Sequence, residues 1–239
     1  MRTGIEIEGI GVISLVRNKT YKNLRLSVNS KQEVRISAPF FISDREAISF
    51  AESKKDWILK AIQKQESQKK TQRIFTEDSE FSTLKHKLEL KKHQSNKLTG
   101  QIRQGVIQLR IPEVLPIESE QAQDFIRQGI EQALRIEAKA YLPSRTRELA
   151  EKYSFETNQI RVKNNKSNWG SCSYQNNINL NIHLMRLPVH LSDYVILHEL
   201  CHTVHRNHGE GFWKLLNKIC KGRAKHLAFE MKAYHPQTL

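Results

Sequence analysis

The sequence lacks the features of a secreted, membrane-spanning or disulfide-stabilised chain. Its cysteines are odd in number, and the spacing of Cys172, Cys201 and Cys220 matches no thiolate zinc motif. No apolar run approaches the ~20 residues of a membrane span. Glu6 and Glu8 interrupt the N-terminal segment, where a signal peptide would need an apolar core. These absences predict reduced thiols, no membrane partner and a cytoplasmic location.

Acidic side chains are also scarce relative to basic ones. The chain has 39 Lys and Arg against 25 Asp and Glu, a formal net charge of +14. Such a balance favours anionic partners and leaves a nucleotide or nucleic acid open as a partner of the basic surface. The charge is spread along the chain, with 22 basic against 14 acidic residues in 1–118 and 17 against 11 in the rest. That distribution is typical of a solvated surface.

What the sequence does contain is a pattern of strands and helices. With 239 residues and 38% hydrophobic content, the chain can bury a core. Alternating apolar residues predict strands around Leu24–Val28, Val34–Ile36 and Ile107–Ile111. Ser43 and Glu46 form the pattern of a capping box and predict the start of a helix.

The prolines at 112 and 116 indicate a linker between two regions. We expect an α+β fold with a strand-rich N-terminal region over residues 1–115 and a second core over residues 116–239. A long helical pattern follows the linker, and Pro143 is expected to kink or split it.

The strongest chemical signal is the sequence His198-Glu199-Leu200-Cys201-His202, an HExxH motif. Two residues four apart lie about 40° apart around a helix and one turn apart along it, so both imidazoles can reach one metal ion. Glu199 lies on the adjacent flank, where it can take a proton from metal-bound water. The apolar residues before the motif predict a buried helix with Ser192 or Asp193 as its N-cap. The competing interpretation is two surface histidines on an amphipathic helix.

A third ligand is available from either His205 or His208. His205 continues the helical stripe, but its Cα would lie about 10.5 Å further along the axis than that of His198. Three imidazoles so spread do not fit bonds of about 2.0–2.1 Å to one zinc ion. We therefore favour His208, provided that the helix ends near Asn207, and leave His205 as the alternative.

Several segments resemble the YgjP-like metallopeptidase domain, a family similar in its core to the SprT-like zinc peptidases. They are Asn168-Trp169-Gly170-Ser171-Cys172, Ile178-Asn179-Leu180-Asn181, Asp193-Tyr194-Val195, the HExxH motif, Asn207-His208 and Phe212-Trp213. The resemblance implies a zincin-like core with the motif on a helix, zinc on His198, His202 and His208, and Glu199 as general base. It also implies a peptide or protein substrate.

The neighbouring segments allow further expectations. The strand at Ile178–Ile182 could lie at the cleft edge and pair with an extended peptide, or be an ordinary half-solvated strand. Trp169-Gly170-Ser171 predicts a tight turn with the tryptophan packed in the core, and Cys201 is expected to pack rather than bind metal.

The function that we favour is a zinc-dependent metallopeptidase that hydrolyses amide bonds with a metal-bound water and a glutamate base. Two alternatives stay open. One is a metal-dependent nucleotide hydrolase acting on phosphoanhydrides. The other is a basic nucleic-acid-binding module with a structural metal.

Overall fold

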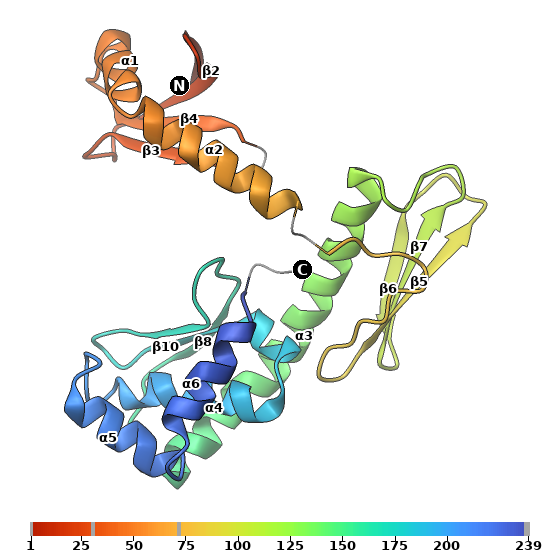
Figure 1. The fold of residues 1–239 in the computed structure, drawn as a ribbon, viewed down its shortest axis with the longest axis vertical. Coiled ribbons are helices and arrows are strands. Elements are labelled where there is room, and N and C mark those ends of the chain that lie inside the picture. The colour runs from red at the N-terminus through yellow and green to blue at the C-terminus, as the bar shows by residue number, and fades with distance from the viewer. Residues whose placement is uncertain (1, 30–31, 71–72, 237–239) are drawn as a thin grey trace. The chain divides into compact units, whose positions relative to one another are not determined.

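The computed structural model describes residues 2–29, 32–70 and 73–236. The chain forms two compact units, Met1–Gln72 and Arg73–Leu239, and both mix helices with small sheets (Figure 1). The sequence pattern places the boundary at residues 115 and 116, whereas the compact units divide at residues 72 and 73. The physical reason is that the strands of residues 87–112 share a hydrophobic core with the C-terminal half of the chain.

Unit 1 is a four-stranded sheet covered by helices. Its elements are β1 (Arg2–Ile7), β2 (Gly11–Asn18), β3 (Arg25–Val28), β4 (Val34–Pro39), α1 (Asp44–Glu52) and α2 (Lys55–Lys70). The strand order is β1-β2-β4-β3, and β2 and β4 are parallel. The capping box at the start of α1 is confirmed: Glu46 N–H donates to Ser43 Oγ, and Ser43 N–H donates to Glu46 Oε2 at 2.9 Å.

Unit 2 contains the remaining elements. They are β5 (Lys87–His93), β6 (Thr99–Arg103), β7 (Val106–Pro112), α3 (Glu120–Lys152), β8 (Ile160–Lys163), β9 (Gly170–Cys172), β10 (Ile178–Asn181), η1 (Ile182–Arg186), α4 (Val189–Cys201), α5 (Glu210–Ile219), α6 (Ala224–Glu230) and η2 (Met231–Ala233). Two three-stranded sheets have the orders β5-β7-β6 and β8-β10-β9. The alternation predicted in β7 is confirmed, because Ile107, Leu109 and Ile111 are all buried.

Helix α3 organises unit 2. It spans 33 residues without interruption, so Pro143 does not split it. Its buried side packs against β7 near one end and against β8, η1 and α4 further along (Figure 1). No helix within the described residues, α3 included, is both long and apolar enough to cross a bilayer.

A buried glutamine on α3 links this helix to the first residues of unit 2. Gln123 accepts from Phe75 N–H at 2.9 Å and donates to the carbonyls of Phe75 and Ile117 at 2.7 and 2.8 Å. Gln123→Leu removes these partners inside the core. We expect a lower free energy of unfolding, by roughly 1–3 kcal/mol for each buried group left unpaired. The measurement is the urea midpoint of unfolding by circular dichroism.

The matched control is Gln101→Leu, because Gln101 is an exposed glutamine of the same unit whose side-chain amide donates to Gln108 Oε1. A surface change of this kind shifts stability by about 0.5 kcal/mol or less. Equal midpoints for the two variants would contradict the structural role given to Gln123.

Candidate metal and catalytic centre

The HExxH motif lies at the C-terminal end of α4. His198 and Glu199 occupy its last turn, and His202 is the C-cap residue. The helix is apolar and mostly buried, as expected. Its start differs from the prediction, because it begins at Val189 after Pro188, and neither Ser192 nor Asp193 caps it. Pro188 is the N-cap residue, and it makes no side-chain hydrogen bond to the helix.

The two polar residues near the start of α4 bond to neighbouring elements instead. Ser192 Oγ–H donates to the carbonyl of Leu184 in η1 at 2.6 Å. Arg145 on α3 donates to both carboxylate oxygens of Asp193, at 2.8 and 2.5 Å. This bidentate pair joins α4 to α3 and thereby fixes the helix that ends in the motif.

Three imidazoles converge at the end of α4. One nitrogen from each of His198, His202 and His208 lies within 4.8 Å of the others. The Nε2 atoms of His198 and His208 are 3.0 Å apart. The helix ends at Cys201, six residues before Asn207, where the sequence placed the break. The loop that follows brings His208 back to the other two rings, while His205 does not join them.

His205 orients the ring of His202 through its backbone carbonyl. The Nδ1–H of His202 donates to the carbonyl oxygen of His205 at 3.0 Å, which leaves Nε2 of His202 available as a donor to a metal. The imidazole of His205 lies against Gly211 at the start of α5. The loop geometry thus gives the two histidines different surroundings.

Phe212 forms an apolar floor under the imidazoles. Its side chain is fully buried, and its ring centroid lies 4.9, 4.6 and 4.8 Å from those of His198, His202 and His208. The sequence does not predict that Phe212 contacts all three rings. The contacts arise from the packing of α5 against α4 and from the path of the loop between them.

Burial favours the neutral form of His198 and His202 and perturbs the neighbouring carboxyl. Burial, with smaller effects from His202 and His208, lowers the pKa of His198 to about 4. Burial also lowers the pKa of His202. Neutral imidazoles are the form that binds metals. Glu199 is 7% exposed, and burial raises its pKa to about 7.

The loop between α4 and α5, residues 202–209, contains His202, His205 and His208, and we call it the histidine loop. Arg206 joins this loop to the turn between β9 and β10, a link that was not anticipated from the sequence. Its guanidinium donates to the carbonyls of Ser173 and Tyr174 at 3.0 and 3.1 Å and to Asn176 Oδ1 at 2.7 Å. It also lies 5.1 Å from the ring centroid of Tyr174. We call these contacts the Arg206 bridge. They attach the segment between His202 and His208 to the neighbouring sheet.

The strands beside the site differ from the expectation in two ways. Ile178–Asn181 forms β10, which is the central strand of its sheet and has both edges paired, so it offers no edge to a peptide. The edge strand is β9, and Gly170 is its first residue rather than part of a tight turn. Trp169 does pack against the core of unit 2. Cys201 is buried, and burial raises its pKa to about 12, as suits a packing residue.

Comparison with known proteins places the chain among the metallopeptidases, a class that implies a metal cofactor and a peptide or protein substrate. The chain belongs to the YgjP-like metallopeptidase domain family, whose profile matches residues 22–233. No curated protein matches the chain.

Two solved structures are similar to part of the chain. One is the metallopeptidase zymogen of Pyrococcus abyssi abylysin, with 20% identity and a TM-score of 0.35 over 38% of this chain and 92% of the other. The other is the metallopeptidase zymogen of Methanocaldococcus jannaschii jannalysin, with 24% identity and a TM-score of 0.35 over 38% of this chain and 93% of the other.

Proposed function

We propose that this chain is a zinc-dependent metallopeptidase in which His198, His202 and His208 hold the metal and Glu199 is the general base. The observation that supports this most directly is the convergence of three imidazoles beside a buried carboxylate at one helix end. Membership of a metallopeptidase family supports the same class of reaction. We place the site in a zincin-like core within residues 116–239, which contain all four residues.

The donor set fits zinc. Catalytic zinc sites use three protein ligands and keep a position open, and neutral imidazole nitrogen is a preferred donor. The three rings supply such nitrogens, and the pKa of His198 is low enough for its ring to be unprotonated at neutral pH. The hydrogen bond from His202 to the His205 carbonyl orients one ring, and Phe212 supports all three from below.

The residues of the chain would divide the work of amide hydrolysis. When bound, zinc would polarise the scissile carbonyl and make a water molecule more acidic. Glu199 takes the proton of the attacking water and delivers it to the leaving amine nitrogen. Burial favours the protonated carboxyl, whereas a nearby cation favours the ionised one, so the two influences on its pKa oppose each other. Such a balance suits a group that must accept and then release a proton.

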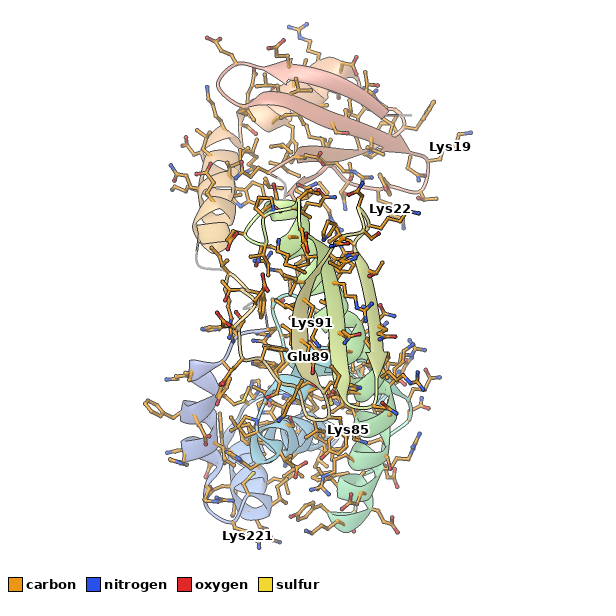
Figure 2. All side chains as sticks on the ribbon, turned by 90° about the vertical axis from the view of Figure 1, so that its right-hand side faces the viewer. Lys19, Lys22, Lys85, Glu89, Lys91 and Lys221 are labelled. Carbon is orange, nitrogen blue, oxygen red and sulfur yellow. The ribbon has the colours of Figure 1, made fainter. Side chains whose placement is uncertain are left out.

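The basic surface does not point to a second function. Lys19 and Lys22 in unit 1, and Lys85 and Lys221 in unit 2, are exposed residues on separate elements (Figure 2). Lys91 pairs with Glu89 at 3.4 Å on an open strand surface. Exposed charges distributed in this way contribute mainly solvation.

The experiment that tests the function compares three substrate classes with the full chain after zinc reconstitution. Casein, a quenched fluorescent peptide library and nucleoside triphosphates are incubated in parallel, with and without 1,10-phenanthroline. We expect cleavage of peptides, loss of cleavage with the chelator, and recovery when zinc is returned, at about one zinc per chain.

Two results would overturn the proposal. Zinc-dependent release of phosphate or pyrophosphate without peptide cleavage would show that the site hydrolyses phosphoanhydrides instead of amide bonds. No turnover together with tight, salt-sensitive nucleic-acid binding would make the chain a binding module.

A further inference from the structure

Glu199 is held in place by packing rather than by hydrogen bonds. Its side chain is almost completely buried, yet its carboxylate has no hydrogen-bond partner within the described part of the chain. A side chain with three rotatable bonds and no polar anchor takes its orientation from the surfaces that it contacts. The atoms around Glu199 therefore decide where its carboxylate points.

One of these surfaces is the backbone of Gly170. A Cβ atom built on Gly170 would lie 2.7 Å from Cγ, 2.9 Å from Cδ and 2.8 Å from Oε1 of Glu199. Nonbonded carbon atoms normally stay about 3.5–4.0 Å apart. The side chain of Glu199 thus occupies the space that any other residue at position 170 would need.

Space, rather than backbone conformation, explains the glycine. The described glycines with left-handed φ angles are Gly9, Gly11, Gly105 and Gly222, and Gly170 is not among them. Alanine could adopt the backbone of Gly170. The closest conflict would be with the side chain of Glu199, since all three of the nearest atoms belong to it.

The strand that contains Gly170 is fixed on two sides. Gly170 pairs with Leu180 in the antiparallel β9–β10 ladder. The turn that follows β9 is attached to the histidine loop by the Arg206 bridge. A methyl group added at position 170 would therefore displace the more flexible partner, which is the end of the Glu199 side chain.

We propose that Gly170 is a positioning residue for Glu199, because its missing side chain creates the recess against which the Glu199 carboxylate rests. This inference rests on the proposed role of Glu199 as general base. It adds a requirement that the HExxH motif does not contain: the flat backbone of a separate strand must face the glutamate.

The test is Gly170→Ala in the zinc-loaded full chain. We expect unchanged zinc content and a Co²⁺-substituted absorption spectrum like that of the wild type, because the three histidines are untouched. The kcat should fall about 10²-fold, the scale of a displacement near 1 Å, with KM changed less than twofold. Gly4→Ala is the matched control, since Gly4 is also in an edge strand and its added Cβ would meet Val12 at 3.4 Å.

A double-mutant cycle separates positioning from general structural damage. In a Glu199→Gln background the base is already absent, so Gly170→Ala should lower the remaining rate by less than twofold. A full 10²-fold loss in both backgrounds would overturn the inference while leaving Glu199 as the base. Wild-type turnover by Glu199→Gln would instead overturn the proposed function itself.

A second variant covers the case in which Gly170→Ala fails to fold. Gly170→Ala combined with Glu199→Ala removes the conflicting side chain, so this double variant should unfold at the same temperature as Glu199→Ala alone. A double variant that melts several degrees lower, or does not fold, would show that the added methyl group conflicts with something other than Glu199 and would overturn the inference.

Discussion

Glu199→Gln is expected to abolish most of the peptidase activity while leaving the metal in place. The substitution preserves size and burial but removes the only group at the site that is proposed to accept the proton. Turnover should fall roughly 10²–10⁴-fold, the usual contribution of a general base. Measurement requires kcat on the best peptide substrate, zinc content by mass spectrometry, and the thermal midpoint of the same preparation.

The stability of this variant has a predictable sign. Burial disfavours the ionised carboxylate, and the pKa of Glu199 is raised to about 7 when no cation is present. The pKa of a glutamate in the unfolded chain is about 4.3, so Glu199 binds its proton more tightly in the folded apo protein than in the unfolded chain. This difference stabilises the folded apo protein below about pH 4.3, and the stabilisation is lost as the pH rises through about 7. The neutral amide has no such cost, so the apo variant should be at least as stable as apo wild type at pH 8.

A metal-replete variant that retained wild-type kcat would refute the assignment of the base.

His208→Ala is expected to lose the metal and His205→Ala to keep it. His208 offers a ring nitrogen to the cluster, whereas His205 offers its backbone carbonyl to His202. Substitution of the His205 side chain preserves that carbonyl, which makes His205→Ala a control in the same loop. Zinc content after dialysis against a weak chelator should fall for His208→Ala only, and activity should follow the metal.

Equal retention of zinc by the two variants would show that His208 is not required, and loss only in His205→Ala would reverse the assignment. The comparison also guards against loop unfolding, because both substitutions lie between the same two helices. Circular dichroism of the two apo proteins should be indistinguishable from that of the wild type.

Features set by neighbouring residues could be predicted from the sequence. The spacing of His198 and His202 depends only on helix geometry, and the capping box of Ser43 and Glu46 depends on four consecutive residues. His208 could be favoured because the alternative histidine was too far along a straight helix. The position at which the helix ends was not predicted, since no glycine or proline marks Cys201 as its last residue.

Features set by long-range packing could not be predicted. Gly170, Phe212 and Arg206 each contact residues of another element. The periodicity of apolar residues within one segment does not indicate which other segment it will contact. The turn signals at Pro112 and Pro116 did mark the end of β7 and the approach to α3. A change of element is not a change of core, however, because Ile107 and Ile126 belong to the same buried cluster.

Pro143 shows the same limit in a helix. It removes one backbone donor, but Lys139, whose carbonyl loses that partner, lies on the exposed side of α3, where water can replace it. The buried residues on either side, Leu142 and Thr146, keep the helix packed.

The Arg206 bridge has a consequence for ligand binding. Because one side chain attaches the histidine loop to the β9–β10 turn, a ligand that restrains one segment also restrains the other. If His208 holds a metal as proposed, any effect of that metal on a ligand bound at the turn is matched by an equal effect of the ligand on metal affinity, because coupling between two sites is reciprocal. A ligand that restrains the turn would then also help to retain a metal at the histidines.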